Sequence, residues 1–151
     1  MQGEKSADLG PFNVGLLLFI PYRELEERVF GAIQAAGFTD LTLPQARLFQ
    51  RLAAHGSRIT ELANRIYVTK QTASALVSAM ERTGYVRRVP DPLDARASLV
   101  LAAERGLAAA EVAAAEIQRI ERQWRQGLGS ARYDRLVRDL NALAEITNRA
   151  Q

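Results

Sequence analysis

The stretch "TKQTASALVSAMERTGYVRRVPDPLDARASLVL" (Thr69–Leu101) changes character halfway along. In its first half, apolar residues recur at spacings of three and four, which predicts a helix with one buried face that ends near Gly84. In its second half, the apolar runs "YVRRV" and "ASLVL" have the residue types of short strands. The segment "DPLDAR" (Asp91–Arg96) between them is rich in turn-forming residues. The stretch therefore predicts a helix followed by a β-hairpin.

The sequence before this stretch predicts two more short helices. "RITELANRIYV" resembles a helix, and only Tyr67 and Val68 separate it from the next, which forces a tight turn. Thr60 and Thr69 are the predicted N-caps of these two helices, because a hydroxyl oxygen can accept from free backbone N–H groups. "TLPQARLFQRLAAHG" predicts an earlier helix, capped by Thr42 and ended by Gly56. Helix, tight turn, helix and hairpin form the pattern of a winged helix-turn-helix.

Longer helices are predicted at both ends of the chain. One spans Pro11 to about Ala36 and contains Pro21, which is expected to kink it. Two follow the hairpin, from Glu104 to about Gln126 and from a predicted cap at Ser130 onward. The run "VGLLLFI" (14–20) is too short to span a bilayer and is expected to be a buried helix face. Such long apolar stripes are expected to pack on each other and on a second copy of the chain.

The predicted fold class is mainly α with a small two-stranded β-hairpin. A winged helix-turn-helix lobe at residues 40–105 is flanked by helical dimerisation regions at 11–37 and 106–151. Residues 1–10 are polar and are expected to form a flexible N-terminal arm.

The composition excludes several kinds of chemistry. The chain has 151 residues, no cysteine and one histidine. Disulfides and thiol catalysis are therefore excluded, and the absence of cysteine suits a cytoplasmic protein. A single histidine argues against a zinc site. Because no nucleophile, base and orienting group converge in the sequence, we predict that the chain is not an enzyme and needs no cofactor or metal.

Positive charge gathers in the middle of the chain. Net charge is +3, and residues 58–105 hold eight basic and five acidic side chains. This is a modest electrostatic footprint for double-stranded DNA. The outward face of the helix that precedes the hairpin is predicted to enter the major groove. Its residues are Lys70, Gln71, Thr72, Ser74, Ala75 and Ser78. Without the hairpin, an ordinary solvated polar face explains this helix equally well.

The hairpin favours DNA binding over a solvated face. Arg87 and Arg88 on the first strand are predicted to contact phosphates, which gives affinity without sequence readout. Arg96 is predicted to enter the minor groove, where narrow A·T-rich stretches concentrate negative potential. Asp94, two residues earlier, is predicted to hold the Arg96 guanidinium in a fixed pose.

Residues 60–106 resemble the core of the MarR family of bacterial transcription regulators. The family has a T/S-x-E-L-A opening, of which Glu61, Leu62 and Ala63 match here. The other shared motifs are an acidic residue and a glycine at the end of the recognition helix (Glu81 and Gly84), and the wing sequence D-P-x-D-x-R at 91–96. The sequence departs from the family pattern at Ala75 and Ala79, where many relatives carry a basic residue, and at Met80, where they carry leucine.

The resemblance implies a homodimer that acts on a palindromic operator as a repressor. It also implies a cleft for a small aromatic or phenolic effector, often an anion, with Phe19, Tyr22, Arg47 and Phe49 as candidate ligand-binding residues. The alternative for these four is core packing for the aromatic side chains and a solvated position for Arg47. The alternative function is a winged-helix protein-interaction module without DNA binding.

Overall fold

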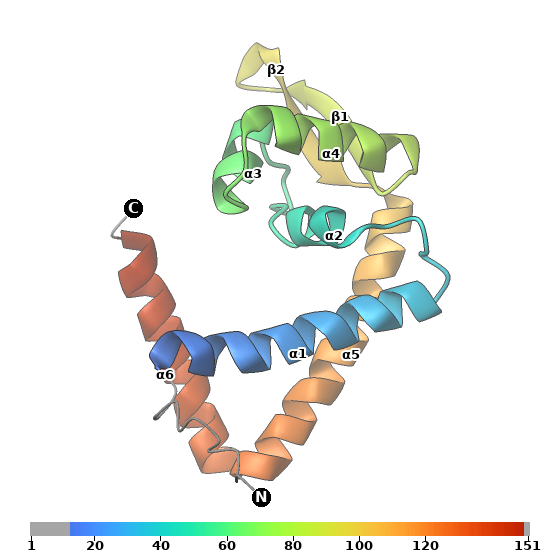
Figure 1. Cartoon of the computed structure of the whole chain (residues 1–151). Helices are drawn as coiled ribbons and strands as arrows, with labels where there is room; N and C mark the ends of the chain where they lie inside the picture. The colour runs from blue at the N-terminus through green and yellow to red at the C-terminus, as the bar shows by residue number, and fades with distance from the viewer. Residues whose placement is uncertain (1–12, 150–151) are drawn as a thin grey trace, which may run out of the picture.

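The computed structural model of the chain describes residues 13–149. Its elements are, in order, α1 (Val14–Ala35), α2 (Leu43–Phe49), α3 (Ile59–Arg65), α4 (Lys70–Arg82), β1 (Val86–Asp91), β2 (Asp94–Ala102), α5 (Glu104–Leu128) and α6 (Ser130–Arg149). Figure 1 shows α2, α3, α4 and the hairpin gathered into one lobe, with α5 leading away from it and α6 folding back. The predicted fold class, helices around a winged helix-turn-helix, is confirmed.

The lobe is built around side chains from each of its helices and from the hairpin. Those with no exposed surface include Leu48, Leu62, Val77, Met80 and Val100. Removing such apolar surface from water stabilises the fold by about 25 cal/mol per Å². This shared core fixes α4 and the hairpin relative to each other, which positions the candidate DNA-binding residues.

The hairpin is anchored at its base and irregular near its tip. The strands pair antiparallel from Val86↔Ala102 to Pro90↔Ser98, and a register shift after Pro90 pairs Asp91 with Asp94. At the base, Ser57 exchanges backbone hydrogen bonds of 3.0 and 2.9 Å with Val100. The tip therefore extends beyond the part of the hairpin that the core holds.

Helix α1 is joined to α5 and α2 by charged side chains. Arg28 donates to the buried carboxylate of Glu116 on α5, at 2.9 Å from Nη2 and 3.2 Å from Nε. Arg47 on α2 makes two bonds to Glu26 on α1, at 2.6 and 2.8 Å. The first pair holds the two long helices together, and the second connects the winged lobe with α1.

Three predicted caps and one predicted helix end are confirmed or corrected by the backbone. Thr42 and Thr69 accept from the backbone N–H of Gln45 and Thr72, as predicted. Thr60 is not a cap, because α3 already begins at Ile59 and its first turn is closed by Glu61, which accepts from the Arg58 N–H. Helix α2 ends at Phe49 instead of near Gly56.

The last helix also starts one residue earlier than predicted. Ser130 is the first residue of α6 and not its cap, because Gly129, with φ of 82°, separates α5 from α6. The Tyr133 N–H already bonds the Gly129 carbonyl. A single glycine therefore forms the corner between these two helices. At the other end of the chain, α1 runs through Pro21 to Ala35.

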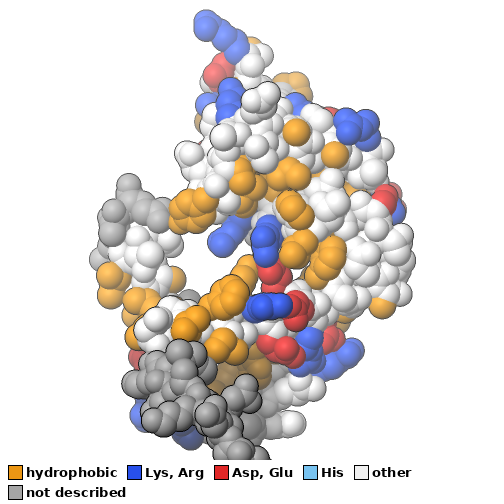
Figure 2. Space-filling model, in the orientation of Figure 1, with side chains coloured by type: hydrophobic (Ala, Val, Ile, Leu, Met, Phe, Trp, Pro, Cys, Tyr) orange, Lys and Arg blue, Asp and Glu red, His pale blue; other side chains and the backbone are white. Residues whose placement is uncertain are grey.

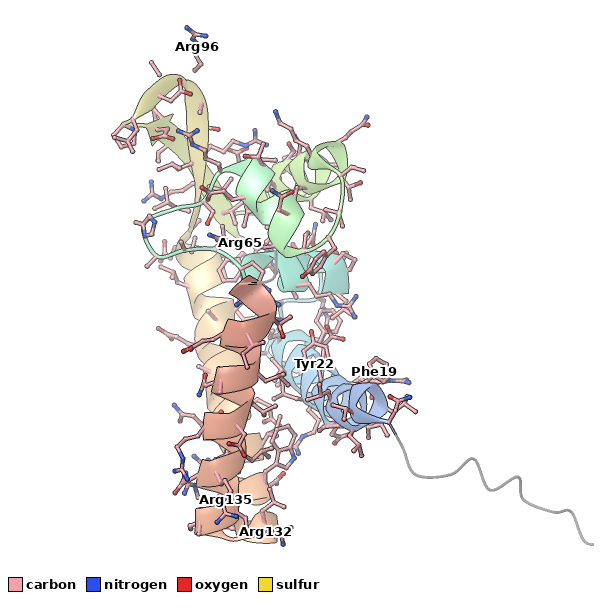
Figure 3. All side chains as sticks on the ribbon, turned by 90° about the vertical axis from the view of Figure 1, so that its left-hand side faces the viewer. Phe19, Tyr22, Arg65, Arg96, Arg132 and Arg135 are labelled. Carbon is pink, nitrogen blue, oxygen red and sulfur yellow. The ribbon has the colours of Figure 1, made fainter. Side chains whose placement is uncertain are left out.

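The expected buried face at residues 14–20 is exposed in the single chain, so that prediction is wrong for one protomer. Val14 is 66 % exposed and Phe19 is 52 % exposed. On α6, the exposed apolar residues are Leu136, Val137, Leu140, Leu143 and Ile146. Figures 1 and 3 together show that α6 and the first turns of α1 diverge rather than cover each other. Within residues 13–149, no helix is both long and apolar enough to cross a membrane.

Candidate nucleic-acid interface

The outward face of α4 collects most of the predicted major-groove residues. Ala73, Val77 and Met80 are fully buried, so they set the orientation of the helix. Five of the six predicted residues then line one shallow depression, and they are Lys70, Gln71, Ser74, Ala75 and Ser78. Thr72 lies outside it, because its hydroxyl oxygen accepts a 2.9 Å hydrogen bond from Thr69. Five of the six residues thus share one outward face of α4, whereas Thr72 lies at its N-terminal end, and contact of this face with DNA stays a prediction.

Arg96 projects from the tip of the wing. Figure 3 shows its side chain at the far end of the hairpin, away from the helices. Among the described residues, its guanidinium makes no hydrogen bond or ion pair. The expectation that Asp94 grips this guanidinium is wrong: Asp94 Oδ1 accepts from the backbone N–H of Arg96 at 3.0 Å. Asp94 therefore shapes the backbone of the tip and leaves the Arg96 side chain uncompensated.

Arg88 is engaged inside the lobe, in contrast to its exposed neighbour Arg87. Its Nη2 donates to Ser78 at 2.8 Å, and its Nε lies 3.2 Å from the Glu81 carboxylate without hydrogen-bond geometry. The Arg88 charge is thus already compensated by α4. This geometry argues against the predicted contact of Arg88 with a phosphate. Instead, Arg88 holds β1 to α4. Arg87 is exposed, and its phosphate contact stays a prediction.

A second contact to the wing has no signal in the sequence. Asp91 is 6 % exposed, and its Oδ2 accepts from Arg58 Nε at 2.7 Å. Its Oδ1 accepts from the Leu93 N–H at 2.9 Å. The Leu93 N–H, and then the Arg58 guanidinium, lower the pKa of Asp91 below its usual value. Because Arg58 and Asp91 are 33 positions apart, no local pattern could have paired them.

Known proteins share both this lobe and the arrangement of the long helices. The sequence model of the MarR family matches residues 39–97. The resemblance predicted from the wing and the helices is thereby confirmed. A search of curated proteins gave no match.

Solved structures with the same fold cover nearly the whole chain. A MarR transcriptional regulator from Methanosarcina mazei is 17 % identical, with 91 % of this chain and 98 % of that chain covered and a TM-score of 0.74. Wild-type MarR from E. coli, in its apo form, is 18 % identical, with coverage of 89 % and 98 % and a TM-score of 0.68. A mutant of S. aureus MepR bound to an oligodeoxyribonucleotide is 18 % identical, with coverage of 91 % and 99 % and a TM-score of 0.58.

A polar cluster joins the winged lobe to α5. The buried Tyr85 donates from its hydroxyl to Asp40 at 2.6 Å, and Arg105 makes bonds of 2.7 and 2.9 Å to the same carboxylate. Arg105 also lies over the Tyr85 ring and donates to the carbonyl of Thr83, the cap of α4. Burial and the hydrogen bond to Asp40 raise the pKa of Tyr85 to about 12. The recognition helix is thus held to the first turn of α5.

A cavity of about 350 Å³ lies between α1, α2 and α5, where the winged lobe meets the long helices. Of the four predicted ligand-binding residues, Tyr22 and Phe49 line it, whereas Phe19 and Arg47 do not. Phe19 lies on the exposed part of α1, and Arg47 is half exposed and bonded to Glu26. Figure 2 shows hydrophobic side chains gathered on α1 and on the lobe above it, along the space between them.

Glu26 is the acidic side chain of this cavity. It accepts from Arg47 and, at 3.2 Å, from the Tyr22 hydroxyl. The bond from Arg47 lowers the pKa of Glu26, so its carboxylate stays ionised. The lining, drawn from the described residues, holds no lysine or arginine.

Proposed function

We propose that the chain is a homodimeric, sequence-specific, double-stranded DNA-binding transcription regulator that represses from an inverted-repeat operator. One observation carries the proposal: the polar face of α4 and the uncompensated Arg96 both belong to one lobe with a shared core. An α-helix fits the major groove, and an arginine fits a narrow minor groove. The MepR mutant, which has the same fold and is bound to an oligodeoxyribonucleotide, supports DNA binding by this chain.

Each surface residue then has a distinct role. Gln71 is suited to a bidentate contact with adenine, and Lys70 to guanine or phosphate. The Ser74 hydroxyl can donate or accept a hydrogen bond at either purine base. Arg87 supplies a phosphate contact that carries no sequence information. Because Ala75 presents only a methyl group, sequence preference depends on few side chains and on the wing.

The dimer is supported by the uncovered apolar faces of α1 and α6. Six of the seven residues at 14–20 are large apolar side chains, and they are between 41 and 66 % exposed in the single chain. Exposed apolar stretches of this extent mark interaction sites in soluble proteins. A second copy of the chain would cover them and place two recognition helices about one DNA turn (roughly 34 Å) apart.

The cavity supports an effector that carries no negative charge. Its lining is mainly aliphatic and aromatic, its acidic group is Glu26, and the nearby Arg47 is already paired. An anionic aromatic compound would find no free cation there. We therefore propose an uncharged aromatic molecule as the effector that releases the repressor from DNA, in place of the phenolic anion that the resemblance implies.

Salt-dependent DNA binding tests the function. Fluorescence anisotropy with random duplex DNA over a series of salt concentrations is expected to show affinity falling as salt rises. Selection of bound fragments from the source genome is then expected to yield an inverted repeat. Absence of duplex binding at low salt would refute the proposal and favour a protein-interaction module.

A further inference from the structure

We propose that Arg58 is a positioning residue for the wing, and that its ion pair with Asp91 aims the wing tip at the minor groove. The inference rests on the proposed function, since it concerns how Arg96 reaches DNA. Arg58 immediately precedes α3, the first helix of the helix-turn-helix, whereas Asp91 closes β1. The pair therefore connects the helical part of the lobe directly with the end of the wing.

Both oxygens of the Asp91 carboxylate are used. Oδ2 accepts two guanidinium nitrogens of Arg58, at 2.7 Å from Nε and 2.5 Å from Nη2. Oδ1 accepts from the backbone N–H of Leu93, in the turn itself. The carboxylate thus links a helix start to the backbone of the turn through one short side chain. A two-nitrogen contact from a planar guanidinium also fixes direction, which the point charge of lysine does not.

The outer half of the wing depends on this link. The base of the hairpin is held by the buried Val86 and Val100 and by the bridge to Ser57. Beyond the register shift at Pro90, the tip is solvated, and Leu93 is 91 % exposed. Among the described residues, the ion pair between Arg58 and Asp91 is the only ion pair that joins residues 90–98 to the start of a helix. Breaking it frees the tip to swing about the base.

For the loss of the Asp91 charge, electrostatics alone and a positioning role predict opposite changes in DNA affinity. The inference is therefore testable. Replacing Asp91 by asparagine removes a negative charge beside the DNA and, through electrostatics, strengthens binding to any duplex. Asparagine also keeps an oxygen for the Leu93 N–H. If the carboxylate positions the wing, the same replacement weakens DNA binding, because the wing tip no longer holds Arg96 in the orientation that reaches the minor groove.

The experiment is a double-mutant cycle between Asp91→Asn and Arg96→Ala in the full chain. The probe is a duplex selected by the wild-type protein from a randomised library, and affinity is measured by anisotropy at fixed salt. We expect Asp91→Asn to weaken binding about five- to tenfold, within the range for one lost DNA contact. In the Arg96→Ala background the same change is expected to have little effect. Glu104→Gln, which removes one exposed carboxylate at the first residue of α5, next to the lobe, is the matched control for charge.

Arg58→Lys provides a second test that keeps net charge constant. It is expected to weaken binding in the wild-type background and not in the Arg96→Ala background, and it replaces Asp91→Asn if that variant fails to fold by circular dichroism. Equal or tighter binding of the variants, or losses that add to that of Arg96→Ala, would overturn the positioning role. Failure of the wild-type protein to bind any duplex would instead count against the proposed function.

Discussion

Gly106, in the first turn of α5, lies directly against the backbone carbonyl of Tyr85. A Cβ at this position would overlap that oxygen and stand 2.5 Å from the Phe49 ring. The close approach seats α5 against both the wing base and α2, at one end of the cavity. Glycine is required here for space and not for an unusual backbone angle.

Gly106→Ala is therefore expected to destabilise the fold by about 3 kcal/mol, the upper part of the usual range for overpacking. Gly31→Ala is the matched control, because Gly31 is also helical and nothing lies within 4 Å of its added Cβ. That change is expected to stabilise by about 0.5–1 kcal/mol. Urea denaturation of both variants measures the difference, and similar stabilities would contradict the packing argument.

The pair of Glu26 and Arg47 predicts a specific dependence of stability on pH. The hydrogen bond from Arg47 lowers the pKa of Glu26 in the folded chain below its value of about 4.3 in an unfolded chain. The pair therefore contributes stability above the unfolded pKa, and this contribution is lost as pH falls through the folded pKa.

We expect the free energy of unfolding to fall between about pH 5 and pH 3, and to fall less in Glu26→Gln. A residual fall is expected from Asp40 and Asp91, whose pKa values are also lowered by their hydrogen bonds. Urea titrations at pH 7, 5, 4 and 3 measure both. An identical pH dependence in wild type and variant would rule out this role for Glu26.

The sequence predicted the winged lobe because its signals are local. Caps at Thr42 and Thr69, the buried spacing of Ala73 and Val77, and the turn residues of the wing all act within a few positions. Helix ends were predicted less accurately, as for α2, which ends at Phe49 and not near Gly56. Tertiary packing and not propensity decides where a short helix ends. The exposure of residues 14–20 could not be read from periodicity, which gives a face but not the partner that covers it.

Side-chain pairing limited the prediction of the site. The α4 face followed from helical geometry, whereas Arg58–Asp91 and Arg88–Glu81 depend on distances between elements. Spacing suggested that Asp94 holds the Arg96 guanidinium, but a carboxylate two residues away reaches the backbone N–H more readily. The ion pair of Arg47 with Glu26 was likewise not predicted, so the availability of Arg47 for an anionic ligand was overestimated.

Gln71→Ala and Arg87→Ala are expected to separate specificity from affinity. Gln71 lies on the polar face of α4, and its loss is expected to change which sequence is preferred. Arg87 is exposed on β1, and its loss is expected to weaken all duplexes alike and to reduce the salt slope by about one unit. Competition over a randomised duplex library measures both effects. Equal, sequence-independent losses in the two variants would contradict this division.

A charge placed on the apolar face of α6 is expected to disrupt the dimer. Leu140 is 39 % exposed in the single chain and belongs to the stripe with Leu136 and Leu143. Leu140→Glu would bury an unpaired carboxylate against the second copy, which is costly in an apolar interface. Ala142→Glu is the control, because two positions along a helix turn the side chain to the opposite face.

Light scattering at micromolar concentration measures the outcome. The wild-type protein and Ala142→Glu are expected to have twice the 16.7 kDa mass of one chain, and Leu140→Glu the mass of one. Because linking two lobes makes the second DNA contact intramolecular, the monomeric variant is expected to bind the inverted repeat about a hundredfold more weakly or worse. Its affinity for an isolated half-site is expected to change little. A wild-type protein that is monomeric and binds a half-site as tightly as the full repeat would exclude the dimeric mechanism.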